Sequence, residues 1–224
     1  EVFNHKAFTG RSGTFYGYEG LGSIYWHMVS KLHLAVEEVC EEATSTQQNQ
    51  EIVHSLQYHF NEIGAGIGIH KSAKVYGAFP TDPYSHTPWH RGAQQPGMTG
   101  QVKEDILTRI GELGVKISYG KIKFQPTLLK KEEFLSQETK AIFVLVDGTE
   151  KNITIEKQSL AFTYCQVPII YKISTSNQLQ LHFTNGENLK VDALELTVEQ
   201  SRAVFLRTNK IVQITVCLTE DNLR

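Results

Sequence analysis

The sequence contains no run of about 18 consecutive apolar residues, which argues against a membrane-spanning helix. It also lacks the pattern of a secretory signal peptide. The net charge is −2, with acidic and basic residues dispersed along the chain, so no basic stripe suggests nucleic-acid binding. We therefore expect neither a membrane nor a nucleic acid among the partners. The chain begins at Glu1 rather than at methionine, and we expect a processed product or a fragment.

Cysteine is scarce, and several familiar catalytic motifs are missing. Cys40, Cys165 and Cys217 are far apart and odd in number, so they predict neither a metal motif nor a disulfide framework. We interpret them as buried free thiols, and we lean toward a cytoplasmic location. The G-x-S-x-G, phosphate-loop, dinucleotide and H-E-x-x-H motifs are absent. We expect no cofactor and no metal.

Glycine and histidine are concentrated in the first half of the chain. Fifteen of the 17 glycines lie at or before Gly120, and eight of the nine histidines lie before residue 91. After residue 120 the chain alternates β-branched and aromatic residues with polar ones, as strands do. This change predicts a helical segment over 1–112 and a β-domain over 113–224.

The first segment predicts three helices. Apolar residues recur at helical spacing over 19–43 and 51–63, and the short polar joint between them predicts an antiparallel pair. A third helix is expected to begin at Thr99 and to end before Gly114. The apolar face of the first helix comprises Leu21, Ile24, Tyr25, Met28, Leu32, Ala35, Val36 and Val39. On the third helix it comprises Ile106, Leu107 and Ile110. We interpret His27, His33, His54 and His59 as packing residues.

The second segment predicts many short strands joined by tight turns. The expected strands are 115–118, 121–125, 141–146, 151–156, 160–165, 167–173, 178–184, 188–191, 193–198, 203–207 and 211–218. Strands of this length and spacing favour an antiparallel β-sandwich. The fold class is therefore expected to be α+β.

Residues 64–98 have no helical or strand period, yet they contain aromatic residues that disordered segments usually lack. We interpret this stretch as an ordered functional loop. Aromatic faces can stack on a sugar ring, while amide, imidazole and guanidinium groups bind its hydroxyls. The candidate substrate-binding residues are His70, Tyr84, His86, Trp89, His90, Arg91, Gln94 and Gln95, together with Arg11 as an anion clamp. Asp82 is the best local candidate for a catalytic carboxyl group.

Several alternatives stay open for these residues. The polar side chains could simply hold the loop in place. His86 and His90 are four residues apart, which would align two metal ligands on a helix, but Pro83 and Pro88 argue against a helix here. A metal-dependent enzyme that uses these histidines and His70 is a further hypothesis. Thr99 and Gly100 open a helix whose free amide groups suit phosphate, although an ordinary N-cap explains them as well.

The run MTGQVKEDILTRIGELGVKISYGKIKFQPTLL (98–129) resembles a segment of inverting disaccharide phosphorylases of the cellobiose phosphorylase type. In that family a Thr-Gly pair opens the last helix of the catalytic barrel, and a glycine, a hairpin and a proline lead into a β-domain. Residues 13–38 likewise look like a late helix of a six-hairpin (α/α) toroid. The resemblance implies that Thr99 and Gly100 contact phosphate, helped by His70, His86 or His90. It also implies that the general acid lies upstream of this chain.

The first hypothesis is therefore the C-terminal portion of a glycoside phosphorylase or glycoside hydrolase, acting on β-linked sugars with inversion. Its expected partners are an oligosaccharide or disaccharide, inorganic phosphate in the case of phosphorolysis, and the N-terminal part of the same enzyme. The first and third helices should then expose apolar residues. The alternative is a non-catalytic carbohydrate-binding or interaction module, which needs a row of exposed aromatics. Phe162, Tyr164, Tyr171 and Phe183 are available, but their alternation suggests a core position.

Overall fold

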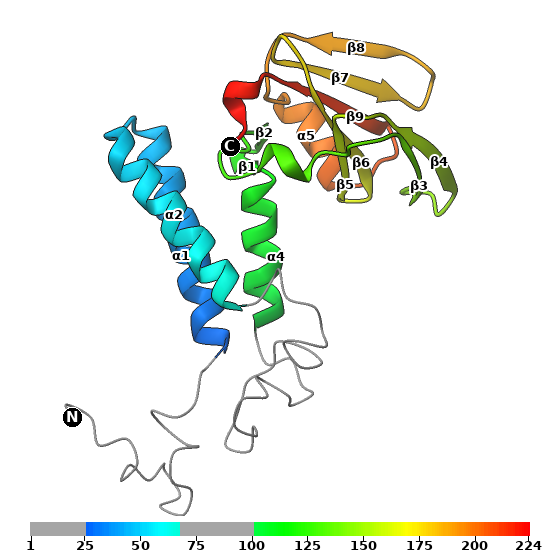
Figure 1. Ribbon diagram of the computed structural model, residues 1–224. Coiled ribbons are helices and arrows are strands. Elements are labelled where there is room, and N and C mark those ends of the chain that lie inside the picture. Colours follow the sequence, from blue (N-terminus) through cyan, green and yellow to red (C-terminus); the bar gives the residue numbers. More distant parts are fainter. Residues whose placement is uncertain (1–25, 68–100) are drawn as a thin grey trace, which may run out of the picture. The chain divides into compact units, whose positions relative to one another are not determined.

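The computed structural model describes residues 26–67 and 101–224. The chain divides into two compact units, Glu1–Arg109 and Ile110–Arg224. The first contains the helices α1 (Trp26–Ser45) and α2 (Gln50–Ile67) and most of α4 (Gln101–Glu112); the second contains the strands (Figure 1). This content of helices and mainly antiparallel strands makes the protein α+β, as the sequence predicts. In the described ranges, no helix is long and apolar enough to cross a membrane.

Helices α1 and α2 form the expected antiparallel pair. Val29 near the start of α1 packs with Ile63 and Ile67 near the end of α2. Between the helices, the Asn49 side chain accepts a hydrogen bond from the Glu51 amide at 2.9 Å and so caps α2. Both helices extend further than expected at their C-terminal ends, to residues 45 and 67. The expected start of the first helix, over 19–25, lies outside the described residues.

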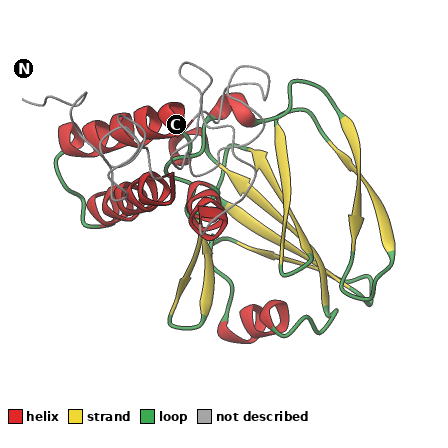
Figure 2. Cartoon of the chain, turned by 90° about the horizontal axis from the view of Figure 1, so that it is seen from below, coloured by secondary structure: helices red, strands yellow, loops and turns green. Residues whose placement is uncertain are grey.

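The second unit is built on a five-stranded sheet and two hairpins (Figure 2). The strands are β1 (Val115–Ser118), β2 (Lys121–Phe124), β3 (Thr139–Val144), β4 (Glu150–Ile155), β5 (Ser159–Tyr164), β6 (Val167–Ile173), β7 (Gln178–Phe183), β8 (Asn188–Val191) and β9 (Ile211–Leu218). β1 pairs with β2 and β3 with β4, while the large sheet has the order β5-β6-β9-β7-β8. Two short 3-10 turns, Lys131–Glu133 and Glu220–Asn222, and the helix α5 (Val198–Phe205) complete the unit.

One pairing in the large sheet departs from the expected antiparallel arrangement. β6 and β9 run parallel, with Ile169 opposite Ile214, whereas the other neighbours in this sheet are antiparallel. The strand expected over 203–207 is also wrong, because these residues belong to α5 or its C-terminal end. Thr197 and Gln200 explain why a helix replaces the expected strand, since they form a capping box that starts α5.

The core of the second unit lies on one face of the large sheet. Its fully buried side chains include Phe124 from β2, Tyr171 from β6 and Leu196 before α5. Tyr171 donates a hydrogen bond from its hydroxyl group to the Leu113 carbonyl at 2.5 Å. On the opposite face Ile170 packs against the β3–β4 hairpin, where Phe143, among others, is buried. The sheet is therefore covered on both faces at β6.

Candidate functional site

All the substrate and catalytic residues proposed from the sequence lie outside the described residues. They are Arg11, His70, Asp82, Tyr84, His86, Trp89, His90, Arg91, Gln94, Gln95, Thr99 and Gly100. The described part of the chain neither brings them together nor separates them. The helices that flank these segments, α1, α2 and α4, lie within the described residues.

Helix α1 buries a face that carries polar side chains. Ser30, His33 and Glu37 are spaced so that they share one side of the helix, and each is at most 7% exposed. The expected apolar stripe lies on the other side: Met28 is 59%, Leu32 is 54% and Val39 is 50% exposed. Met28, Leu32 and Val39 are therefore not the residues through which α1 packs on α2. The reason is that the pairing of α1 with α2 selects the other side of the helix.

His33 joins α1 to α2. Its ring stacks on that of Phe60, with centroids 4.1 Å apart and planes 23° from parallel. Burial lowers the pKa of His33, and a hydrogen bond to the Phe60 backbone offsets this only in part. His33 is thus a packing residue, as expected, and it favours the neutral form. His54 and His59 differ from expectation, because both are exposed on α2.

Helix α4 repeats the pattern of α1. Glu104 and Thr108, one turn apart, are 4% and 5% exposed, while Ile106 and Leu107 are 54% and 44% exposed. The Asp105 carboxyl group forms a hydrogen bond with the side chain of Ser30, which links α4 to α1. Partial burial raises the pKa of Asp105, the Ser30 hydrogen bond opposes that rise, and the nearby Glu104 carboxylate adds to it. A carboxyl group with a raised pKa keeps its proton to a higher pH.

Three of these buried groups have polar atoms without a hydrogen-bond partner among the described residues. They are His33 Nε2, Glu104 Oε2 and Thr108 Oγ1. Buried polar atoms in folded proteins are nearly always paired, with protein, water or a bound group. Among residues 26–67 and 101–109, the polar faces of α1 and α4 therefore have hydrogen-bonding capacity to spare. The spacing of Ser30, His33 and Glu37 could have revealed this face in the sequence.

The second unit contains a cavity of about 530 Å³ beside α5. Its lining combines apolar side chains with charged ones, drawn from the end of β7, from α5, from the segment between α5 and β9, and from the start of β9. The lining residues are Phe183, Glu199, Gln200, Arg202, Ala203, Leu206, Thr208, Lys210 and Ile211. Sequence reasoning missed this cavity because it expected strands over 193–198 and 203–207.

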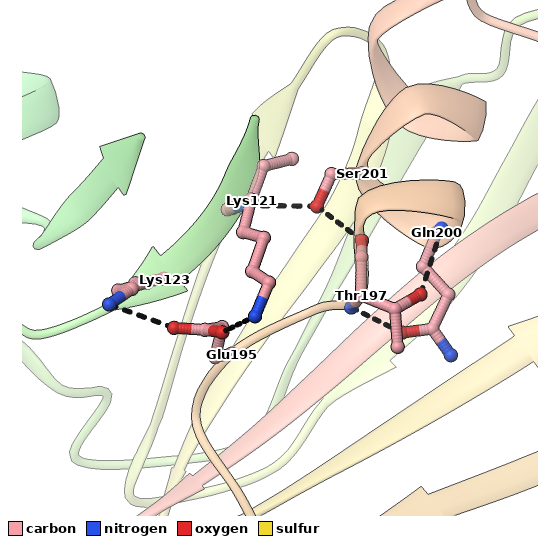
Figure 3. Close-up of polar contacts among 7 residues, drawn as sticks. Lys121, Lys123, Glu195, Thr197, Gln200 and Ser201 are labelled. Carbon is pink, nitrogen blue, oxygen red and sulfur yellow. Dashed lines mark hydrogen bonds and ion pairs between the residues drawn. The ribbon is translucent and has the colours of Figure 1, made fainter. Parts of the chain in front are cut away.

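A polar network holds α5 against the β1–β2 hairpin (Figure 3). The Ile122 amide of β2 donates to Ser201 Oγ at 2.9 Å, and Ser201 Oγ donates to the Thr197 carbonyl at 2.8 Å. The Glu195 carboxylate binds two lysines of β2, Lys121 at 2.6 Å and Lys123 at 2.8 Å. These bonds lower the pKa of Glu195, Lys121 contributing most. The network is structural, since it fixes the helix that lines the cavity.

The aromatics needed for a sugar-binding sheet face lie in the core instead. Tyr171 is fully buried, and Phe162, Tyr164 and Phe183 are half-buried and packed against the same core cluster. The rings of Phe162 and Tyr171 meet edge to face, with centroids 5.2 Å apart. The alternation therefore predicted their position correctly, and these four residues do not form an exposed row.

The three cysteines lie within the described ranges. All three cysteines are free, as expected; Cys40 is buried, whereas Cys165 and Cys217 are only half-buried. Over residues 26–67 and 101–224, no group of three or more His, Cys, Asp or Glu side chains could hold a metal ion. His70, His86 and His90, the ligands of the metal-dependent hypothesis, lie outside these ranges.

Comparison of the sequence with known protein families and with curated proteins finds no match to this chain.

Proposed function

We propose that this chain is the C-terminal portion of a carbohydrate-active enzyme that cleaves or phosphorolyses β-linked glycosidic bonds with inversion. In such a reaction a carboxylic acid protonates the leaving oxygen while water or phosphate attacks the opposite face of the sugar. The proposal assigns sugar binding to the aromatic and polar residues of 64–98. It assigns phosphate or a sugar hydroxyl to Thr99 and Gly100.

The observation that carries the proposal is the local structure of the passage that resembles the phosphorylases. A helix, a glycine, a hairpin and a proline follow one another as α4, Gly114, β1–β2 and Pro126. Gly114 has a φ of +70°, and a Cβ atom there would lie 2.2 Å from the Pro126 nitrogen. The Gln125 amide also donates to the Gly114 carbonyl at 2.7 Å. Gly114 and the Gln125-Pro126 pair therefore pack directly against each other. This contact is a physical reason for the spacing between the glycine and the proline.

The exposed apolar stripes of α1 and α4 support the same proposal. Soluble proteins seldom leave contiguous apolar stripes uncovered, and in an (α/α) barrel each helix packs against neighbours on both sides. Met28, Leu32 and Val39 on α1, and Ile106 and Leu107 on α4, have the exposure that such neighbours would cover. The expectation of exposed apolar residues on these two helices is met.

The test is an activity assay on the full-length protein that contains this chain. It is incubated with a panel of β-linked disaccharides and oligosaccharides, with and without inorganic phosphate, and the products are separated by chromatography. We expect free sugar in the hydrolytic case and a sugar 1-phosphate in the phosphorolytic case. No product under either condition across the panel would contradict the proposal, and glycan binding without turnover would favour the binding-module alternative.

Two variants test the residue assignments in that assay. Asp82→Asn should lower the rate about 10²–10⁴-fold if Asp82 acts as an acid or base. Thr99→Ala should raise the KM for phosphate more than the KM for the sugar, because it removes a group assigned to the anion. Thr99→Ser keeps the hydroxyl group and serves as the matched control.

A further inference from the structure

The lining of the cavity beside α5 combines residues of the core, such as Ile211, with residues that face away from it. Arg202 and Ala203 follow Glu199 by three and four residues, and Leu206, the C-cap, follows them by four and three, so the four residues form one stripe along α5. The core-facing residues of the same helix are different ones, since Ser201 is 0% and Val204 1% exposed. Leu206 remains 61% exposed although it is apolar. The part of α5 that lines the cavity is therefore not the side that carries Ser201 and Val204.

Four of the residues that line the cavity are apolar. Phe183 at the end of β7 and Ile211 at the start of β9 stand beside Ala203 and Leu206 of α5. A volume of about 530 Å³ lies within the range of sites for small organic molecules, about 300–1,000 Å³. The cavity can therefore take one apolar group of moderate size.

Two cationic side chains in the lining lack a carboxylate partner within the described part of the chain. Arg202 and Lys210 are exposed and form no ion pair among the described residues. By contrast, four other lysines of this unit each lie within 3.0 Å of a carboxylate; they are Lys121, Lys123, Lys131 and Lys172. Glu199 is the one acidic residue of the lining, so two cations and one anion leave a net charge of +1. The cavity therefore favours an anion.

Two polar side chains could orient a bound group. Gln200 uses its carbonyl oxygen to accept from the Thr197 amide at 2.9 Å, and that bond leaves its amide hydrogens available. Thr208 donates from its hydroxyl group to the Ala203 carbonyl at 3.2 Å, which leaves its oxygen as an acceptor. A few such polar groups in an apolar pocket are typical of sites that bind small molecules in one orientation.

We propose that this cavity binds a small amphipathic carboxylate, with its apolar group on Phe183, Leu206 and Ile211 and its carboxylate between Arg202 and Lys210. Guanidinium and ammonium groups form charge-assisted hydrogen bonds with carboxylates, which are stronger than neutral ones. The site lies within the second unit and does not depend on the proposed glycosidic activity. Either idea can fail while the other stands.

A matched pair of probes tests the proposal on the full chain. 4-Phenylbutyrate and 4-phenylbutan-1-ol share the same apolar part and differ in charge. Each is titrated into the ¹⁵N-labelled protein while amide chemical shifts are followed. We expect the carboxylate to bind about tenfold more tightly than the alcohol. The largest shifts should fall on Leu206, Thr208 and Ile211.

Charge variants decide whether the cations are responsible. Arg202→Gln combined with Lys210→Gln should abolish the preference for the carboxylate. The control is Lys140→Gln combined with Lys190→Gln, which removes two exposed lysines outside the lining and should bind as the unmodified protein does. Leu206→Ser should weaken both probes. Each variant is first checked for an unchanged thermal unfolding midpoint.

The proposal is overturned if neither probe binds at 10 mM, if both bind equally, or if the shifts cluster away from α5. It is overturned as well if the Arg202 and Lys210 variant keeps the preference for the carboxylate.

Discussion

At Gly114 the backbone itself leaves no room for a side chain. Its φ of +70° is a backbone conformation that residues other than glycine rarely adopt. A Cβ atom at this position would also lie 2.2 Å from backbone atoms of Gln125 and Pro126. Gly120, in the β1–β2 turn, has a similar φ of +75° but no atom within 4 Å of a Cβ position. Substitutions at the two glycines therefore distinguish the free-energy cost of a positive φ, which both positions share, from that of a steric clash, which only Gly114 has.

Gly114→Ala is expected to destabilise the protein by about 3 kcal/mol or more, because strain and overpacking add. Gly120→Ala, the matched control, should cost about 1–2 kcal/mol from the backbone angle alone. Urea unfolding of both variants measures the difference. An equal cost at the two positions would contradict the close contact between Gly114 and Pro126.

The Glu195 carboxylate predicts how stability responds to acid. Its two lysine partners lower its pKa in the folded protein below the ordinary value of 4.5. A group with a lowered folded pKa contributes stability that is present above its unfolded pKa and is lost as the pH falls through the folded value. Because Glu195 is solvent-accessible, we expect a small effect.

Glu195→Gln should therefore lower the unfolding midpoint at pH 7 and flatten its decline below about pH 4.5. The measurement is a set of thermal melts from pH 7 to pH 3 for both proteins. Glu138→Gln, at an exposed position outside this network, should leave the pH profile unchanged. Parallel profiles for the Glu195 variant and the unmodified protein would count against the ion pairs.

At the scale of elements, α1 and α4 show that amphipathic spacing locates a helix but does not select its buried side. The apolar stripe of α1 stays exposed at Met28, Leu32 and Val39, whereas the buried side of the helix carries His33, which stacks on Phe60 of α2. Periodicity reports which residues share a face, and here each helix has two usable faces. The partner that chooses between them is remote in sequence.

Two valines give a matched test of this orientation. Val39 on α1 is 50% exposed and Val53 on α2 is 6% exposed. Val39→Ala should change the free energy of unfolding by no more than about 0.5 kcal/mol, since exposed positions tolerate truncation. Val53→Ala should cost about 2 kcal/mol, because it empties part of a buried contact. Chemical denaturation of this chain measures both, and the reverse order would show that α1 packs through its apolar stripe.

Helix α5 illustrates a local signal that the alternation of residues concealed. Over 193–207 apolar and polar residues alternate well enough to suggest strands. Thr197 and Gln200, however, have the spacing of a capping box, and the structure contains both of its hydrogen bonds. The capping box in the first turn thus favours a helix over a strand in this segment. Recognising the box would have predicted the helix, though not the cavity beside it.

At the scale of the whole molecule, the division at Ile110 predicts that the second unit folds by itself. Its core contains buried residues from before β1 to the end of β9, including Leu113, Tyr171 and Leu218. About 115 residues with a core of this extent is an ordinary size for an independent domain. The contacts that close this core lie within the unit, among them the hydrogen bond from Tyr171 to Leu113.

A chain shortened to residues 110–224 should therefore unfold cooperatively, with dispersed amide signals in NMR spectra. A chain shortened to 116–224 is the control, because it lacks Leu113, Gly114 and Val115 and should be clearly less stable. Loss of cooperative unfolding in the longer of these two chains would show that the second unit depends on the first.

The sequence by itself determined the helix pair, nine of the strands and the change from helical to β structure, because these depend on local periodicity and turn chemistry. The two-residue turn at Tyr119-Gly120, with both φ angles positive, is one example. Only the tertiary structure decided the parallel pairing of β6 with β9, the buried side of α1 and the cavity beside α5. Each of these joins segments that are distant along the chain, and no local pattern specifies which distant surface a face will meet.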